Sequence, residues 1–207
     1  MAIISGAFGL AAFACLIVFL VMRPSDQRIA QILLRGHDVG VIVQCLCLIP
    51  FALALAAIVR RHSHGSSRVM AATAVSFLAL VVVLMLLSFA NVAADVLYMI
   101  PQGAVGAWLI VVCWKFATDL PKGLRRLGIV AGVGLMLISI FPLGYALFVD
   151  SAILHGPISD DDPAPPGTET ADGIVHAALA IGTLIGCTAY PIWTALAGRW
   201  LLLRGGK

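Results

Sequence analysis

The chain alternates between long apolar runs and short polar connections. Each run has about 20 residues, the length that an α-helix rising 1.5 Å per residue needs to cross a hydrocarbon core about 30 Å thick. None of the runs alternates polar and apolar positions as the strands of a membrane barrel do. The pattern therefore predicts an all-α membrane protein, a bundle of six transmembrane helices. The six runs cover residues 2–22, 38–58, 69–90, 98–116, 127–149 and 173–197.

Composition agrees with a membrane protein. Of the 207 residues, 61% are hydrophobic and 11% are charged, whereas about 25% of the residues in a soluble domain are charged. Residues 1–6 contain no Lys or Arg, so the first run lacks the basic start of a signal peptide, and we expect it to be a retained helix.

The basic residues are concentrated on one side of the predicted bundle. If six spans place both termini on that side, it holds ten of the thirteen Lys and Arg residues, and the other side holds nine of the ten Asp and Glu residues. Since basic residues favour the cytoplasmic side, we expect cytoplasmic N- and C-termini in a multi-pass protein of the cell inner membrane. The ten are Arg60, Arg61, Arg68, Lys115, Lys122, Arg125, Arg126, Arg199, Arg204 and Lys207.

The first exterior connection departs from this charge pattern. It contains the other three basic residues, and its apolar residues Ile29, Ile32 and Leu33 share one face at helical spacing. We therefore predict a short interfacial helix that lies on the outer leaflet. The three basic residues are Arg23, Arg28 and Arg35.

The largest exterior connection, residues 150–172, is acidic and rich in proline. It includes three successive Asp residues, 160–162, and no Lys or Arg. Such a composition does not form a core by itself, so we expect a flexible connector. The alternative is a lid over the outer ends of the second, third and sixth helices.

The candidate chemistry lies at the outer edge of the membrane, because no ionisable residue falls in the middle of a predicted span. Asp172 and His176 are four residues apart and share a helix face. With His37, Asp38 and Asp95 they could bind a divalent metal, or a carboxylate–His pair among them could act as a general base. Alternatively, Asp38 and Asp172 are simply the N-caps of the second and sixth helices.

Several functions remain open. We favour a non-catalytic membrane protein that binds lipid or a hydrophobic ligand, or that is a subunit of a membrane complex, and we predict no cofactor. The alternative is a membrane enzyme with a His/Asp site at the outer leaflet. The third is a small-solute transporter, which the lack of ionisable residues at mid-span disfavours. The basic connections are too short for a nucleic-acid surface.

The small and the aromatic residues support two further predictions. GxxxG motifs at Gly128 and Gly132, and at Gly182 and Gly186, predict close helix contacts within the bilayer, either in the bundle or with a partner or second copy. Aromatic residues near the cytoplasmic helix ends predict interfacial anchors. These are Trp108, Trp114, Tyr190, Trp193 and Trp200.

Two segments resemble known proteins. LPKGLRRLGIVAGVGLMLISIFPLG, residues 120–144, has a Leu-Pro and basic turn into the fifth run, and YPIWTALAGRWLL, residues 190–202, closes the chain. Together they resemble small polytopic bacterial inner-membrane proteins in families of unknown function. The resemblance implies a six-helix bundle in a bacterial inner membrane and carries over no functional residues.

Overall fold

The computed structural model describes residues 1–60, 66–115, 120–155 and 165–205 of the chain. The described residues form six α-helices and one short 3-10 helix, η1, and contain no strand, which confirms the all-α class. The elements are α1 (Ala2–Met22), α2 (Gln27–Arg60), α3 (Ser66–Phe89), α4 (Met99–Lys115), α5 (Lys122–Phe148), η1 (Ser151–Leu154) and α6 (Glu169–Gly205).

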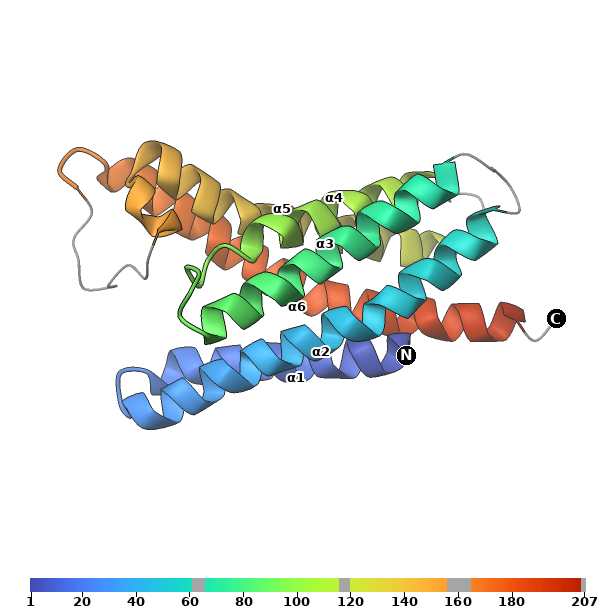
Figure 1. The fold of residues 1–207 in the computed structure, drawn as a ribbon, viewed down its shortest axis with the longest axis horizontal. Helices are drawn as coiled ribbons and strands as arrows, with labels where there is room; N and C mark the ends of the chain where they lie inside the picture. Colours follow the sequence, from blue (N-terminus) through green and yellow to red (C-terminus); the bar gives the residue numbers. More distant parts are fainter. Residues whose placement is uncertain (61–65, 116–119, 156–164, 206–207) are drawn as a thin grey trace.

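Successive helices run in alternating directions along one long axis (Figure 1). Each packs against its neighbours in sequence, and α6 also packs against α1, so that the helices close into a ring. Both termini lie at the same end of the bundle, which we call the terminal end (Figure 1). The opposite end carries Asp26, Asp95 and Asp172, and we call it the acidic end.

Five of the described helices are long and apolar enough to cross a membrane, and α4, with 17 residues, is shorter. The chain is thus a helical protein with several candidate membrane spans, while the count of six spans and the orientation of the termini stay predictions. The five candidates are Ala2–Met22, Gln27–Leu55, Arg68–Phe89, Lys122–Phe148 and Glu169–Leu203.

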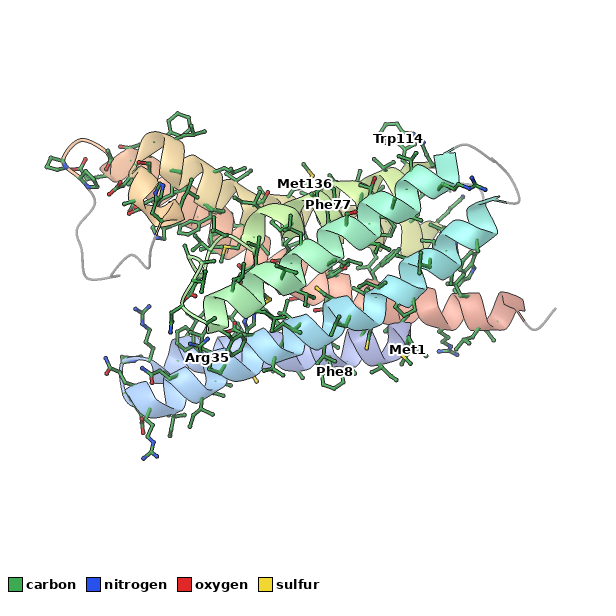
Figure 2. The ribbon with its side chains drawn as sticks, viewed as in Figure 1. Met1, Phe8, Arg35, Phe77, Trp114 and Met136 are labelled. Atoms are coloured by element: carbon green, nitrogen blue, oxygen red, sulfur yellow. The ribbon has the colours of Figure 1, made fainter. Side chains whose placement is uncertain are left out.

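The outer surface of the bundle is apolar. Phe8 of α1, Trp114 of α4 and Met136 of α5 are exposed and project outward from different helices (Figure 2). A surface of this kind suits contact with lipid chains, because no water is available there to solvate polar groups.

The prediction of a separate interfacial helix before the second span is wrong. The chain turns at Asp26, whose Oδ1 accepts hydrogen bonds from the backbone amides of Arg28 (2.9 Å) and Ile29 (3.1 Å). This capping starts α2 at Gln27, so that the segment with the predicted apolar face forms the first turns of one long helix. Asp38 therefore lies inside α2 and is not its N-cap.

Asp172 is not an N-cap either. The carbonyl of Thr168 accepts the hydrogen bond of the Asp172 amide at 2.9 Å, and α6 begins at Glu169. Asp172 lies in the first turn, where its carboxylate is close to the positive end of the helix dipole. The sixth helix thus starts four residues before the predicted residue 173.

The connection between α5 and α6 begins with packed structure, although its composition predicted a flexible connector from residue 150. Asp150 caps η1 by accepting the amide hydrogen of Ala152 at 2.8 Å. Ile153 of η1 is buried against Phe141, Tyr145 and other residues of α5 and α6. Residues 156–164, on which the lid alternative depends, lie outside the described residues.

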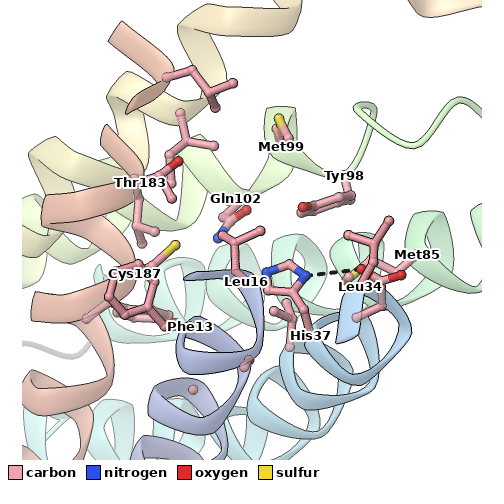
Figure 3. Close-up of a pocket in the computed structure, with 18 of the residues that line it drawn as sticks. Phe13, Leu16, Leu34, His37, Met85, Tyr98, Met99, Gln102, Thr183 and Cys187 are labelled. Atoms are coloured by element: carbon pink, nitrogen blue, oxygen red, sulfur yellow. Dashed lines mark hydrogen bonds and ion pairs between the residues drawn. The ribbon is translucent and has the colours of Figure 1, made fainter. Parts of the chain in front are cut away.

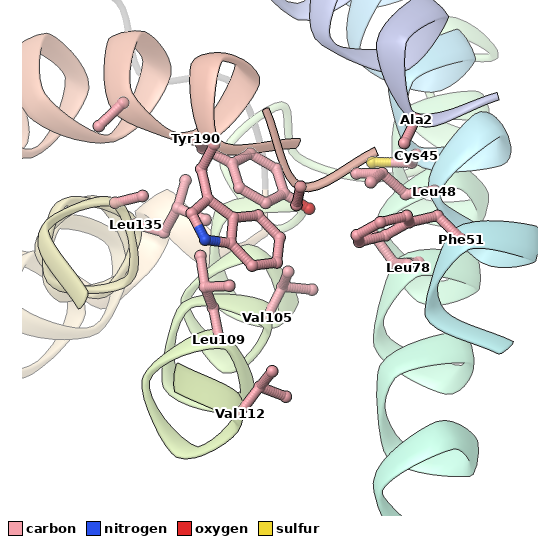
Figure 4. Close-up of a cluster of buried hydrophobic side chains, with 14 of the residues drawn as sticks. Ala2, Cys45, Leu48, Phe51, Leu78, Val105, Leu109, Val112, Leu135 and Tyr190 are labelled. Atoms are coloured by element: carbon pink, nitrogen blue, oxygen red, sulfur yellow. The ribbon is translucent and has the colours of Figure 1, made fainter. Parts of the chain in front are cut away.

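The main core gathers residues of all six helices (Figure 4). Phe51 of α2 meets Trp193 of α6 edge to face, with ring centroids 5.9 Å apart. Tyr190 and Trp193 are both buried, so the prediction that they are interfacial anchors is wrong, because α6 turns this face toward α2 and α5. Core members include Ala2, Leu48, Leu78, Leu109, Leu135 and Tyr190.

Glycines bring the helix backbones together. A Cβ added at Gly134 of α5 would overlap the backbone of Gly186 on α6, 2.6 Å from its Cα. The four glycines of the predicted motifs all face neighbouring helices of the same chain. The predicted close packing is therefore confirmed within the bundle, and contact with another chain stays a prediction. The four are Gly128, Gly132, Gly182 and Gly186.

Candidate functional site

A cavity of about 770 Å³ lies between the helices on the side of the acidic end (Figure 3). All six helices and the turn between α3 and α4 contribute to its wall, which is mostly apolar. Leu16 on α1 and Cys187 on α6 belong to the apolar part. Polar side chains gather at the end of the cavity nearer to Asp95.

On α2, His37 and Asp38 form a pair in the cavity wall. His37 is only 6% exposed, and its Nδ1 lies 3.1 Å from the carboxylate Oδ1 of Asp38. A carboxylate only accepts hydrogen bonds, so Nδ1 carries the proton and Nε2 is left as an acceptor in the neutral ring. Figure 3 shows the second ring nitrogen on the cavity side, toward Leu16 and Gln102.

Arg35 approaches the same carboxylate from outside the cavity. Its Nη1 is 3.8 Å from Oδ2 of Asp38, and half of its side chain is exposed. The guanidinium also lies over the ring of Phe89 at 4.6 Å. An exposed ion pair of this length contributes little to stability, and Arg35 offsets part of the charge of Asp38 from outside the cavity.

The turn between α3 and α4 places the second carboxylate. Asn91 adopts a left-handed conformation, φ 55°, and its amide bonds to the carbonyl of Ser88 at 2.9 Å. Asn tolerates this conformation better than most residues, and it ends α3 and directs the chain back across the cavity. The hydroxyl of Ser88 donates to Oδ1 of Asp95, which fixes that carboxylate at the cavity wall.

Tyr98, at the end of this turn, points its hydroxyl into the cavity (Figure 3). Burial, followed by the negative charges of neighbours that include Asp38 and Asp95, raises the pKa of Tyr98. The phenol is therefore neutral at physiological pH. It offers both a hydroxyl and an aromatic face close to two carboxylates.

On α6, His176 contributes to the cavity wall while Asp172 lies behind it. Nδ1 of His176 is 3.0 Å from the backbone oxygen and 3.1 Å from Oδ1 of Asp172. Its ring also meets Phe141 edge on, with centroids 5.1 Å apart. Both oxygens accept, so Nδ1 carries the proton here too.

Gln44 is a buried polar side chain of the wall. It lies two turns beyond His37 on α2 and is 5% exposed. Its amide rests against Gly9 of α1, where an added Cβ would come within 2.6 Å of Nε2. Among the residues that the structure describes, Nε2 has no hydrogen-bond partner. A buried amide without a partner is costly, and a ligand atom in the cavity would remove that cost.

The cavity opens sideways between α1 and α6. The two helices meet closely toward the terminal end, where a Cβ on Gly6 would come within 2.6 Å of the Pro191 carbonyl. Closer to the acidic end, Ile17 of α1 and Leu184 of α6 line the cavity yet are 42% and 63% exposed. Wall residues with this exposure mark an opening on the apolar outer surface.

The structure brings together four of the five predicted site residues. His37, Asp38, Asp95 and His176 line the one cavity, and Asp172 is bonded to His176 from behind. Within the described ranges, no group of three or more His, Cys, Asp or Glu side chains is arranged to hold a metal ion. What the geometry does contain is an imidazole oriented by a carboxylate, the arrangement of a hydrogen-bond acceptor or a general base.

Sequence reasoning missed most of the cavity wall. Leu16 and Ile17 are apolar, and no pattern in the sequence distinguishes an apolar residue that lines a cavity from one that faces lipid. Gln44 and Thr183 are polar residues at mid-span, where such residues commonly bond between helices, and here both line the cavity. The signal available in the sequence was the spacing of Gln44, which lies seven residues after His37 and therefore on the same helix face.

Comparison of the chain with protein-family models, with curated proteins and with solved structures found no match.

Proposed function

We propose that this chain is an integral membrane protein that binds a lipid-like amphiphile in the cavity between its helices. The cavity itself carries the proposal. Its volume of about 770 Å³ falls within the range of about 300–1,000 Å³ typical of small-molecule sites. Its apolar wall with polar groups at one end matches a molecule that has an apolar chain and a polar head.

The opening between α1 and α6 supports an amphiphile that comes from the membrane. Ile17 and Leu184 border this opening and are exposed on the apolar surface. A chain could pass between them without crossing water, while its head stays near His37 and Asp95. Gln44 would donate from Nε2 to an oxygen of the bound molecule.

The same proposal includes the membrane arrangement. The chain crosses a bacterial inner membrane six times with both termini in the cytoplasm, so that the cavity opens in the outer leaflet. The alternating helix directions and the shared end of the termini support this arrangement (Figure 1). With 17 residues, α4 is about 26 Å long, which is near the lower limit for a transmembrane helix.

Photo-crosslinking tests the proposal. Hexadecanol with a diazirine on its chain is added to the purified full-length chain in phosphatidylcholine nanodiscs, and adducts are located by peptide mass spectrometry. We expect adducts on the cavity face of α6, at residues 179–187, that unlabelled hexadecanol competes away. Contact with bulk lipid at the outer surface should give adducts that do not saturate.

Two tryptophan substitutions on α1 provide a matched pair. Leu16→Trp places an indole in the cavity, and Val18→Trp places one on the exposed face at a similar depth. The first should abolish the saturable adducts, and the second should keep them. Equal adducts in both variants, with both folded by size-exclusion chromatography, would refute binding in the cavity.

A further inference from the structure

The proposed binding of an amphiphile does not specify its polar head. The head would lie at the polar end of the cavity, which we call the rim and which comprises His37, Asp38, Asp95, Tyr98 and His176. The acidic residues and the histidines that line the cavity are two carboxylates and two imidazoles, Asp38, Asp95, His37 and His176. Among the described residues that line it, none is Lys or Arg. Arg35 pairs with Asp38 from outside the cavity, and the two carboxylates together still leave the rim negative when its histidines are neutral.

The hydrogen-bonding groups of the rim are mainly acceptors. Nε2 of His37 is an acceptor because Nδ1 donates to Asp38. The carboxylate of Asp95 receives the Ser88 hydroxyl on one oxygen and keeps its second oxygen for another donor. A ligand head that complements these groups supplies hydrogen-bond donors and positive charge.

An aromatic face lies beside the acceptors. Tyr98 shares the cavity wall with Asp38 and Asp95, and its phenol stays neutral. A cation near an aromatic ring gains further attraction from the ring quadrupole. Carboxylates and an aromatic ring together suit an ammonium group better than a neutral alcohol or a phosphate.

Gln44 gives an independent indication that the cavity has an occupant. Its amide is more than nine-tenths buried and Nε2 has no partner in the described part of the chain. Gln44 lies on the same face of α2 as His37, about 10 Å further along the helix at 1.5 Å per residue. An occupant would therefore extend from the rim into the depth of the cavity.

We infer that the amphiphile bound by this cavity has a cationic amine head, held at the rim by Asp38 and Asp95 beside Tyr98. The inference rests on the proposed function and specifies its ligand class. At the acidic end, the described carboxylates outnumber the described basic residues, Arg23, Arg28 and Arg35. The carboxylates are Asp26, Asp38, Asp95, Asp150, Glu169 and Asp172. Their summed field favours the approach of cations.

Competition among three matched molecules tests the inference. Hexadecylamine, hexadecanol and hexadecanoic acid share a chain and differ in the head, and each is titrated against the photoreactive hexadecanol in nanodiscs at pH 7. We expect the amine to halve the cavity adducts at a concentration about tenfold lower than the alcohol does, since one nearby carboxylate in a partly screened site contributes this much. The acid should compete least.

Removing the charge of each rim carboxylate tests whether the stronger competition by the amine arises at the rim. Asp38→Asn and Asp95→Asn should each reduce the amine's advantage over the alcohol severalfold and leave competition by the alcohol unchanged. Glu169→Gln removes a carboxylate at the start of α6 that does not line the cavity, and it should keep the advantage.

The outcomes separate the two proposals. If Leu16→Trp leaves the adducts unchanged, the cavity does not bind amphiphiles and the proposed function fails. If Leu16→Trp removes the adducts but the alcohol or the acid competes as well as the amine, only the cationic head is refuted. The cationic head is also refuted if the amine still competes better than the alcohol in both Asp38→Asn and Asp95→Asn.

Discussion

Gly134 shows how much a single missing side chain can matter in this bundle. Its backbone lies directly against that of Gly186, so α5 and α6 approach more closely there than any side chain would allow. Within lipid, where apolar chains surround the helices on all sides, such close packing is a main source of helix association. The contact also holds α6 in the position from which His176 and Cys187 reach the cavity.

Gly134→Ala should destabilise the protein by about 1–3 kcal/mol, the usual cost of overpacking. The matched control is Gly173→Ala near the start of α6, where an added Cβ meets nothing within 4 Å. That change should stabilise slightly, because Ala is a better helix former than Gly. Thermal unfolding of both variants in the same detergent gives the comparison, and equal melting temperatures would contradict the proposed backbone contact.

His176 is a second residue whose role can be tested. Its ring is bonded to Asp172 and packed against Phe141 and Tyr145, which explains its position without a metal. A bound metal would stabilise the fold by mass action. We therefore expect the melting temperature of wild type and of His176→Ala to be unaffected by chelator and by added zinc. A shift of several degrees in wild type alone would instead support a metal site at the rim.

At the scale of elements, η1 joins the α5–α6 hairpin through one buried side chain. Ile153 packs into a small cluster with Phe141, Tyr145 and Val175, separate from the main core. The Asp150 cap sets the short helix so that this side chain turns inward. The start of the acidic connection is thus part of the fold, although its composition is typical of a loop.

Ile153→Ala should cost about 2–5 kcal/mol, as other truncations of buried isoleucines do. Ser151→Ala, at an exposed position of the same short helix, should change the free energy of unfolding by less than about 0.5 kcal/mol. Chemical unfolding in mixed micelles, followed by circular dichroism, measures both. Equal effects would mean that η1 does not anchor the hairpin.

The locations of the helices could be predicted from the long apolar runs, but the residues at which the helices begin could not. Runs of about 20 apolar residues located all six helices. The predicted start of α2 is eleven residues too late, because the apolar run begins at Asp38 whereas Asp26 accepts the first amide hydrogens of the helix. The sixth helix also begins earlier than predicted, at Glu169, because the backbone amide of Asp172 is already bonded to the carbonyl of Thr168.

At the scale of the whole molecule, the proposed topology makes a prediction about access. Single cysteines at positions 165 and 65, each in a background without native cysteines, are labelled with a membrane-impermeant maleimide. With cytoplasmic termini, position 165 should react in intact cells and position 65 only after permeabilisation, because basic residues favour the inner side. The opposite pattern would invert the bundle and turn the cavity toward the cytoplasm.

The site could be predicted only in part. The polar residues at the acidic end were identifiable because ionisable groups are rare in this chain, and four of them do share a cavity. The cavity itself could not be predicted, because it arises from the divergence of α1 from α6 beyond Gly6. That divergence depends on the sum of many helix contacts. The sequence does not show whether a residue such as Leu16 faces the cavity or the outer surface.

The lengths of the helices have a consequence for the surrounding bilayer. At 1.5 Å per residue, α4 extends about 26 Å and α6 about 56 Å. If both cross the same membrane, α6 can tilt or project into water, but α4 has no spare length. The hydrocarbon layer beside α4 must therefore be thin. This hydrophobic mismatch would either favour a thin membrane or thin the bilayer locally beside α4.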